Sequence, residues 1–364
     1  MDHMATRTSH KVGLIGYGLA GRVFHAPLIE AAPGLDLSVI VTANAGRAAQ
    51  AREDFPAAHV VPEVNAAFAG ADRVDVIVVA TSNDSHVPLA LRAIDAGLSV
   101  VIDKPMAATV ADGRRLVEQA QSAGVMATVF QNRRWDGDFL TVQDLVKSGR
   151  LGRIHRYESR FERWSPRLRE NSWREDPDPS QAGGVLYDLG THLIDQAIVL
   201  FGPVVSVFAE LDRLRADSVV DDDVFVAMAH ANGVRSHLWA SKAAPVLGPR
   251  FRVLGDQAGY SIYGLDPQEQ QLASGLRPGA PDWGRSNPSR DGLLGVLEDV
   301  ETVPTLPGAY QHFYTSLVAA LDGEGPPPVD PRNAVEVLRI IDAAQRSAAE
   351  EITVPMDPEP GSRQ

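Results

Sequence analysis

Short hydrophobic runs alternate with helical patterns over the first third of the chain. The runs that predict strands lie at 11–17, 37–42, 74–81, 98–105 and 125–132. Between them, 85–97 and 109–124 show helical periodicity, and the first of these ends on Gly97, as a helix C-cap does. Strands that lack polar alternation and are separated by helices are typical of a parallel sheet covered on both faces. We therefore expect a doubly wound α/β sheet over residues 11–127.

The pattern changes after about residue 150, where strand-like runs follow one another directly. These predicted strands lie at 154–164, 204–214, 223–241 and 250–264. An Asn232-Gly233 pair inside the third run indicates a hairpin turn, and successive hairpins build an antiparallel sheet. The predicted helices lie at 183–202, 309–323 and 331–351, with a loop at 274–292. We expect residues 128–364 to form a second, α+β domain with a large, mostly antiparallel open sheet, and residues 1–10 to form a disordered tail.

Composition narrows the classes of function. The chain has 364 residues, of which 44% are hydrophobic and 22% charged, as is ordinary for a globular protein. Its net charge of −13 argues against nucleic acid or an anionic membrane as a partner, since both are bound through basic patches. The chain has no cysteine, which excludes thiolate metal sites, and its ten histidines show no metal-ligand spacing. The lack of metal-ligand patterns predicts a protein without a bound metal. With no visible export signal and no apolar run of about 18 residues, we also expect the protein to be cytoplasmic.

The segment GLIGYGLAG, residues 13–21, predicts a dinucleotide site. It holds a G-x-G-x-x-G pattern directly after a strand and before a helix. There the first glycine permits a tight turn, the second lets the backbone approach the pyrophosphate, and the third lets helix and strand pack closely. The amides at the helix start then face the phosphates. The predicted cofactor contacts of this loop are Gly16, Gly18, Leu19, Ala20 and Gly21.

The end of the second predicted strand bears on the choice between NAD and NADP. A ribose-binding acid is expected there for NAD, but the place holds Thr42, Ala43 and Asn44, with Arg47 shortly after. The missing carboxylate removes a partner for the free 2′-hydroxyl and also the repulsion of a 2′-phosphate. We therefore expect NADP to be preferred over NAD, with Thr42, Asn44 and Arg47 at its 2′-phosphate. A solvated helix residue is the alternative for Arg47.

Two further segments carry candidate chemistry. The run VVIDKP puts Lys104 at the carboxyl end of a strand, where open α/β sheets bind ligands. The run YDLGTHLID holds Asp188 and His192 four residues apart, which predicts that they share one helix face. By themselves these residues fit either an ordinary strand exit and a surface ion pair or an acid/base site. Asp195, which follows on the same helix, is predicted to be structural.

Three motifs in this order resemble those of the Gfo/Idh/MocA oxidoreductase family, and the resemblance covers nearly the whole chain. It rests on GYGLAG, on DKP where the family usually has E-K-P, and on GGVLYDLGTHLID. The segments VFHAPLI and FQNRRWDGDF are further similar to the NADP-linked scyllo-inositol dehydrogenase branch. The resemblance implies that Lys104, Asp188 and His192 are the catalytic residues, that they also bind substrate, and that they lie beside the nicotinamide. Asp103 departs from the family's glutamate and shortens a side chain that contacts the cofactor region.

Other residues near the same sheet edge are candidates for contacts with cofactor or substrate. The further predicted cofactor contacts are Ala80, Thr81, Asn83, His86, Asp103, Lys104, Gln131, Trp173 and Arg174. Asn132, beside Gln131 at a strand end, is predicted to bind substrate. The tryptophan–arginine pair matches one that is common in the family, with ordinary loop packing as the alternative. Either a polar substrate or surface salt bridges would account for Arg133, Arg134, Arg160 and Arg163.

The resemblance implies an NAD(P)-dependent dehydrogenase in which His192, assisted by Lys104, takes the proton of a sugar or polyol hydroxyl. Two alternatives stay open: a non-catalytic dinucleotide-binding regulator of the same fold, and a glycosidase that uses transient oxidation by tightly held NAD. Retention of all three catalytic residues favours the enzyme, and the missing ribose acid disfavours the glycosidase. The strand DVFVAMAH is apolar on both faces while the domain has few helices to cover it, which predicts a homodimer or homotetramer.

Overall fold

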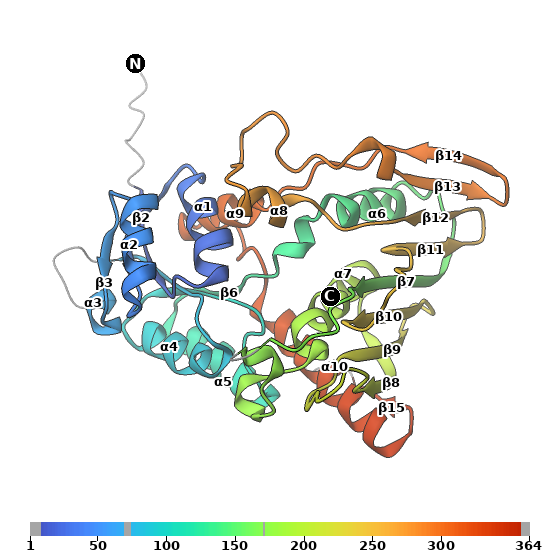
Figure 1. The fold of residues 1–364 in the computed structure, drawn as a ribbon, viewed down its shortest axis with the longest axis horizontal. Coiled ribbons are helices and arrows are strands. Elements are labelled where there is room, and N and C mark those ends of the chain that lie inside the picture. Colours follow the sequence, from blue (N-terminus) through green and yellow to red (C-terminus); the bar gives the residue numbers. More distant parts are fainter. Residues whose placement is uncertain (1–8, 69–73, 170–171, 358–364) are drawn as a thin grey trace.

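The computed structural model describes residues 9–68, 74–169 and 172–357, and its first sheet has six parallel strands in the order β3-β2-β1-β4-β5-β6 (Figure 1). These strands are β1 (His10–Ile15), β2 (Leu35–Val41), β3 (His59–Val61), β4 (Val76–Val79), β5 (Ser99–Ile102) and β6 (Ala127–Val129). All four residues of β4 are buried, which explains why the sequence shows no polar alternation there. The predicted doubly wound sheet is confirmed. Most of the predicted tail, residues 1–8, lies outside the described residues, whereas His10 already pairs with Leu35 in the sheet.

Helices pack against both faces of this first sheet. One face packs against α1 (Ala26–Glu30), α2 (Ala45–Asp54) and, from near the end of the chain, α9 (Gln311–Leu321). The other face packs against α3 (Val64–Phe68), α4 (Asn83–Asp95) and α5 (Val110–Ala123). The Thr109 hydroxyl caps α5 by accepting a hydrogen bond from the amide of Asp112, and Gly124 ends the helix in the left-handed conformation at φ 65°. Because α9 returns to the first sheet, residues from both ends of the chain build this core.

The second sheet has nine strands in the order β14-β13-β12-β11-β7-β10-β9-β8-β15. These strands are β7 (Ile154–Glu162), β8 (Val204–Asp212), β9 (Asp223–His230), β10 (Arg235–Ser241), β11 (Phe251–Gly255), β12 (Gly259–Ile262), β13 (Gly292–Val296), β14 (Asp299–Val303) and β15 (Val354–Pro355). Neighbouring strands run antiparallel except β7 and β10, which run parallel. The predicted Asn232-Gly233 turn joins β9 to β10, with Gly233 at φ 91°. The mostly antiparallel second sheet is thus confirmed.

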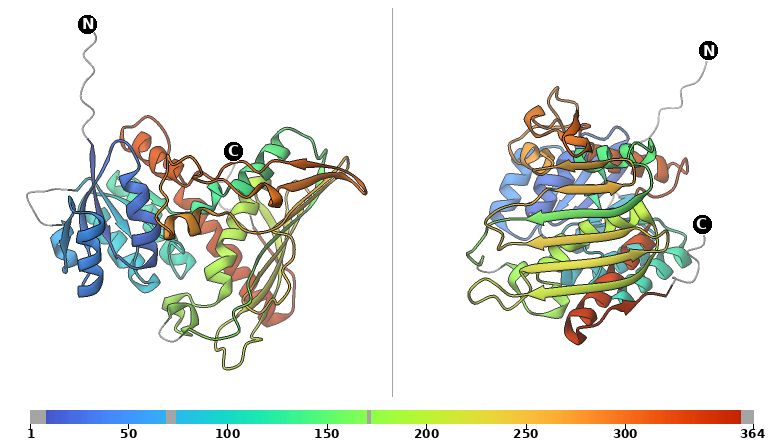
Figure 2. Two further views of the ribbon diagram at one scale, coloured as in Figure 1. Left: turned by 45° about the horizontal axis from the view of Figure 1, so that its top comes forward. Right: turned by 90° about the vertical axis from the view of Figure 1, so that its right-hand side faces the viewer.

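Only one face of the second sheet packs against helices of the described chain. That face covers a core shared with α6 (Gly137–Lys147), α7 (Thr191–Phe201) and α10 (Pro331–Glu350). The opposite face is turned toward the viewer in the right-hand view of Figure 2, with no helix in front of it. Along β9, buried residues alternate with half-buried ones, so Phe225 points to this open face while Val224 and Val226 point to the core. The helices that cover the second sheet therefore lie on the side that faces the first sheet (Figure 2).

Several elements differ from the sequence prediction. The helix predicted at 183–202 begins with a π-helical turn, Leu186–Gly190, before α7, and a second π-helical turn, Ala20–His25, precedes α1. The sequence pattern did not predict α6, α8 (Gln268–Ala273), β13 or β14. In β14 four of the five residues are exposed, so an edge strand of this kind shows no apolar alternation. π-helical turns have no sequence signature of their own, and they often occur at functional sites.

Candidate active site

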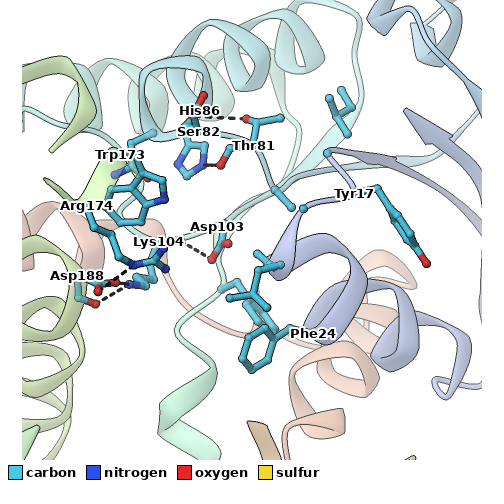
Figure 3. A pocket seen from close by; sticks show the side chains of 18 of the residues that line it. Tyr17, Phe24, Thr81, Ser82, His86, Asp103, Lys104, Trp173, Arg174 and Asp188 are labelled. Carbon is cyan, nitrogen blue, oxygen red and sulfur yellow. Dashed lines mark hydrogen bonds and ion pairs between the residues drawn. The ribbon is translucent and has the colours of Figure 1, made fainter. Parts of the chain in front are cut away.

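A cavity of about 1100 Å³ lies at the carboxyl edge of the first sheet and is lined by residues of both sheets' domains. Its first wall follows the loops after β1, β2, β4 and β5, which all end at the same edge of the sheet. Its second wall comes from the turn before α7, from α7 itself and from the segment after β7. Figure 3 shows the side chains of the two walls facing each other across this cavity. A cavity at the carboxyl ends of parallel strands is the expected place for a ligand in an open α/β sheet.

The glycine loop forms the floor of the cavity at the end of β1. Gly16 has φ 103°, and a Cβ atom there would lie 2.3 Å from the Ala80 carbonyl oxygen. At Gly21 a Cβ atom would lie 2.0 Å from the Gly16 carbonyl oxygen, so the turn and the following helix start can pack only without a side chain. Gly18 is different, because a Cβ atom would meet only Arg47 Nη1, at 3.8 Å. Gly16 and Gly21 thus shape the loop, whereas Gly18 leaves the backbone of the loop open to the cavity.

The loop after β2 provides polar groups and no acid. Thr42, Asn44 and Arg47 all line the cavity. The Asn44 side-chain oxygen accepts a hydrogen bond from the amide of Arg47 at 2.9 Å and so caps α2, which leaves its amide group to donate elsewhere. The guanidinium of Arg47 has no side-chain partner in the described part of the chain and lies beside Gly18. This edge therefore offers hydrogen-bond donors and a positive charge.

Asp188 lies at the centre of a charged cluster that joins the two walls (Figure 3). The ammonium of Lys104 donates to the Asp188 backbone carbonyl at 2.5 Å and lies 3.3 Å from its Oδ1. The guanidinium Nε of Arg174 lies 2.9 Å from the other carboxylate oxygen. Burial alone would raise the pKa of Asp188, but Lys104 and Arg174 hold that pKa well below its usual value. Burial lowers the pKa of Lys104, and Asp188 offsets part of that effect.

His192 lies one turn beyond Asp188, on α7, and lines the same cavity. It is 5% exposed, and its Nδ1 is buried with no hydrogen-bond partner in the described structure. Burial lowers the pKa of His192 well below its usual value, and the positive charges of Lys104 and Arg133 lower it further. The imidazole is therefore neutral at neutral pH and able to accept a proton.

Asp103, which follows β5, contacts both its neighbour Lys104 and the buried side chain of His25. Its Oδ1 accepts a hydrogen bond from the Lys104 amide at 2.8 Å, and its Oδ2 lies 3.8 Å from His25 Nε2. The other ring nitrogen of His25 is 2.6 Å from the Tyr314 hydroxyl on α9. Burial would raise the pKa of Asp103, but its contact with His25, with smaller effects of His86 and Lys104, keeps that pKa below its usual value. The carboxylate is thus held in place from two sides.

Most of the residues predicted from the sequence line this cavity. The predicted residues that line the cavity are Gly16, Gly18, Leu19, Ala20, Thr42, Asn44, Arg47, Ala80, Thr81, Asn83, His86, Asp103, Lys104, Asn132, Trp173, Arg174, Asp188 and His192. Gly21 lies behind the loop, where it packs against Gly16, and Gln131 is buried away from the cavity wall. One ring nitrogen of His86 lies 2.8 Å from the Pro105 carbonyl oxygen, and the other lies 3.3 Å from the Thr81 carbonyl oxygen. His86 therefore contacts both the loop after β4 and the loop after β5.

The predicted arginines divide between the cavity and the packing of the second domain. Arg134 forms a two-pronged pair with Asp195, at 2.8 and 2.6 Å, and Asp195 is 2% exposed. Arg160 stacks over Trp239 at 3.9 Å on the open sheet face. Arg133 and Arg163 line the cavity. The expectation of a surface salt bridge is wrong for Arg133, because its guanidinium is buried, at 7% exposure of the residue, where it pairs with Glu269 at 2.8 Å at the cavity.

Several cavity residues were not found from the sequence. They include Tyr17, Phe24, Arg169, Glu175, Lys242 and Glu269. Tyr17 stands inside the glycine motif, where spacing alone could have indicated it, and its hydroxyl donates to Asp54 at 2.7 Å. Lys242 and Glu269 are single residues in unrelated segments with no motif around them, so only the folded chain brings them to the wall.

The described residues offer neither a metal site nor a membrane-spanning helix. Within 9–68, 74–169 and 172–357, no three side chains of His, Asp or Glu are grouped so that they could hold a metal ion. The helices of the same ranges include none with the length and apolar character needed to cross a membrane.

Two family models match the chain one after the other. A model described as the oxidoreductase family's NAD-binding Rossmann fold matches residues 10–131, and one described as the same family's C-terminal alpha/beta domain matches residues 143–356. The chain belongs to the Gfo/Idh/MocA oxidoreductase family. The resemblance seen in the motifs is thereby confirmed, and so is the expectation of an NAD(P)-dependent dehydrogenase.

Members of the Gfo/Idh/MocA family resemble this chain over almost its full length. The uncharacterized oxidoreductase YdgJ of Escherichia coli is 40% identical over 348 residues, which cover 94% of this chain and 98% of YdgJ. The NADP-dependent scyllo-inositol 2-dehydrogenase IolW of Bacillus subtilis is 33% identical over 351 residues, covering 95% and 96% of the two chains. Among solved structures, the YPO2259 protein of Yersinia pestis is 37% identical and superposes with a TM-score of 0.90, covering 99% of this chain and 100% of its own.

Proposed function

We propose that this protein is an NADP-preferring dehydrogenase that oxidises a hydroxyl carbon of a sugar or cyclic polyol, an inositol-like compound among them. The observation that supports this most strongly is that Lys104, Asp188 and His192, from two domains, meet on the cavity that also holds the glycine loop. The similarity to IolW, whose name gives both NADP and scyllo-inositol, supports the same assignment.

The glycine loop fits a dinucleotide. Gly16 and Gly21 leave no room for a Cβ atom, whereas Gly18 opens the backbone toward the cavity, as close approach of a pyrophosphate requires. In the proposal the loop residues Gly16 to Ala20 hold the phosphates, and Trp173 with Arg174 lies over the nicotinamide end of the cavity. When bound, the nicotinamide supplies the redox chemistry by accepting a hydride from the substrate carbon.

His192 is proposed as the base that takes the substrate hydroxyl proton. Its imidazole is neutral because burial and nearby cations lower its pKa, and it lines the cavity without an internal hydrogen bond that would occupy it. A base with a free lone pair at neutral pH can accept the proton as the carbon is oxidised. Lys104 contributes a positive charge that favours the developing alkoxide over the neutral alcohol.

Asp188 is proposed to orient Lys104 and to contact the substrate. Both of its carboxylate oxygens already face cations, Lys104 at 3.3 Å and Arg174 at 2.9 Å. Its low pKa keeps it ionised, so it does not compete with His192 for the proton. The backbone contact from Lys104 to Asp188 fixes the ammonium between the two walls, where it can meet a substrate hydroxyl.

The proposed preference for NADP rests on the loop after β2. Arg47 and the amide group of Asn44 can donate to a 2′-phosphate, and residues 42–49 contain no acid that would repel it. The guanidinium lies next to Gly18, at the proposed phosphate-binding loop. A charged donor without another partner is suited to a phosphate.

The protein is also proposed to be a homodimer or homotetramer assembled through the open face of the second sheet. On that face Trp239 and Phe225 lie with their rings 5.1 Å apart, and Leu293 is 46% exposed. A sheet face that carries aromatic and aliphatic side chains and lacks covering helices is typical of an interface.

A substrate panel tests the proposed activity. The purified protein would be mixed with NADP⁺ or NAD⁺ and a series of polyols, inositols and sugars, and the near-ultraviolet absorbance of reduced nicotinamide would be followed. We expect formation of reduced cofactor with at least one polyol and loss of that activity in His192→Asn. Tight cofactor binding without turnover of any alcohol would contradict the proposal and favour a regulator.

A further inference from the structure

The lining of the cavity carries an unbalanced positive charge. The chain as a whole carries a net charge of −13, yet the described cavity wall has seven Lys or Arg residues and four Asp or Glu residues. An excess of cations in a concave site of an acidic protein attracts anions and raises their local concentration.

Most of the wall's cations have an acidic partner. Lys104 and Arg174 share Asp188, Lys242 lies 3.4 Å from Glu175, and Arg133 lies 2.8 Å from Glu269. The three that have no side-chain hydrogen bond or ion pair in the described part of the chain are Arg47, Arg163 and Arg169. Arg47 lies at the glycine loop and is proposed above to meet the 2′-phosphate. Arg163 and Arg169 belong to the other wall and remain unexplained by the cofactor.

The backbone of Arg163 is held firmly at the end of β7. Its amide donates to the Ser241 carbonyl at 2.8 Å, and its carbonyl accepts from the Ala244 amide at 3.2 Å. These bonds continue the pairing of β7 with β10 beyond the strand ends, so the arginine projects from a fixed point rather than from a free loop. The charge of Arg163 also lowers the pKa of His192, which indicates that its guanidinium lies within electrostatic reach of the imidazole.

The position of Arg163 relative to the cofactor loop separates the two anion sites. The glycine loop follows β1, and Arg47 stands in the first turn of α2, both in the first domain. Arg163 and Arg169 follow β7 in the second domain, on the same wall as His192 and Lys242. A guanidinium presents a planar pair of donors that match a carboxylate or a phosphate.

We propose that the substrate is a sugar or polyol that carries an anionic group, either a carboxylate or a phosphate ester, and that Arg163, with Arg169 on the same side of the cavity, binds this group. The proposal rests on the proposed dehydrogenase activity and specifies the class of its substrate. The anionic group anchors the molecule on the second wall, so that a hydroxyl carbon elsewhere in the molecule lies between Lys104 and His192. Arg163 is thus a residue that determines specificity.

Anion binding to the cofactor-saturated protein tests the site directly. With NADP⁺ in saturating amount, inorganic phosphate and acetate would be titrated separately by calorimetry into wild type, Arg163→Gln and Arg167→Gln. Arg167 is a matched control, since it is an exposed arginine of the same segment that does not line the cavity. We expect one or both anions to bind wild type and the control, and Arg163→Gln to weaken binding roughly tenfold to a hundredfold, the usual loss for a hydrogen bond to a charged group.

The relative affinity of the protein for phosphate and acetate distinguishes a phosphate ester from a carboxylate as the anionic group of the substrate. Tighter phosphate binding indicates a phosphate ester, and tighter acetate binding indicates a carboxylate. Binding of neither anion, or an equal loss in Arg163→Gln and Arg167→Gln, would overturn the assignment of Arg163.

Kinetics separate a failure of this inference from a failure of the proposed function. Matched compounds would be compared, such as glucose, glucuronate and glucose 6-phosphate, and inositol with an inositol monophosphate. We expect higher kcat/KM for the anionic member of a pair, and a selective loss of that advantage in Arg163→Gln. Equal turnover of neutral and anionic members, unchanged by Arg163→Gln, would overturn the inference and leave the dehydrogenase intact. Absence of turnover for every compound, with cofactor bound, would instead contradict the proposed function.

Discussion

The ammonium of Lys104, at the end of β5 in the first domain, donates a hydrogen bond to the backbone carbonyl of Asp188 in the second domain, 84 residues further along the chain. The same ammonium faces the Asp188 carboxylate, which Arg174 contacts from the other side. One contact thus fixes the two domain walls relative to each other and places a lysine whose pKa is lowered by burial in the cavity.

Removing the proposed acid/base pair should reduce turnover and spare cofactor binding. For His192→Ala and Lys104→Ala we expect kcat to fall by about 10² or more, the usual contribution of a positioned acid or base. The glycine loop and Arg47 remain, so the NADP⁺ dissociation constant should change little. Steady-state kinetics on the substrate found in the panel, with cofactor titration by fluorescence, provide both values. A near wild-type kcat for His192→Ala would show that another group takes the proton.

Arg47→Ala should erode the preference for NADP. A charge-assisted hydrogen bond to the 2′-phosphate contributes about 1.5–3 kcal/mol, which corresponds to roughly a tenfold to hundredfold weaker NADP affinity in the variant. NAD lacks this phosphate, so its affinity should stay nearly the same. The matched control is Arg52→Ala, which removes an arginine of the same helix that does not line the cavity. Equal losses for both cofactors would show that Arg47 does not contact the 2′-phosphate, and tighter binding of NAD by wild type would contradict the preference itself.

The two glycines Gly18 and Gly21 should respond differently to alanine. At Gly18 the added Cβ meets only Arg47 Nη1 at 3.8 Å, so the protein should fold normally but bind NADP⁺ at least about tenfold more weakly, since the methyl group occupies the path of the pyrophosphate. At Gly21 the Cβ would lie 2.0 Å from the Gly16 carbonyl oxygen, so the backbone must move and the free energy of unfolding should fall by about 1–3 kcal/mol. Thermal unfolding without cofactor and cofactor titration measure the two effects. Unchanged cofactor affinity in Gly18→Ala would remove the loop from the binding site.

The low pKa of His192 should appear in the pH dependence of stability. Above pH about 6.5 the imidazole is neutral both folded and unfolded, so it contributes no pH dependence. As the pH falls below that value, the unfolded chain binds a proton at this position and the folded chain does not, because burial lowers the folded pKa. Wild type should therefore lose stability relative to His192→Asn, by at most about 1.4 kcal/mol per pH unit. A difference in unfolding free energy that stays constant from pH 7.5 to 5.5 would contradict a neutral buried His192.

Disrupting the open sheet face should dissociate the proposed oligomer. Trp239→Asp places a charge where the indole now stacks with Phe225, and an interface at this face cannot bury that charge unpaired. Light scattering at micromolar concentration should show a dimer or tetramer for wild type and a monomer for the variant. NADP⁺ binding should be retained, because Trp239 does not line the cavity. A wild-type protein that is already monomeric would refute the oligomer.

The local patterns of this chain were sufficient to predict the elements whose apolar residues repeat. The strand β4 follows from an unbroken apolar run, and the helix α5 follows from the helical periodicity of residues 109–124. The edge strand β14 was missed because four of its five residues are exposed and it carries no such repeat, and α8 was missed because its six residues are too few to show one. The Asp188 to His192 spacing predicted a shared α-helical face, whereas the structure places Asp188 in a π-helical turn and His192 in α7, with both lining the cavity.

The sequence by itself determined the glycine loop, the absence of an acid after β2, and the motifs that hold Lys104, Asp188 and His192, because each of these depends on residues that are close together in the chain. The tertiary structure alone decided which distant side chains meet. It paired Lys104 with Asp188 and Arg133 with Glu269, and it left Arg163 on the cavity wall with no acidic partner among the described residues. The physical reason is that the charge of a site depends on distances across the fold, and local periodicity carries no information about those distances.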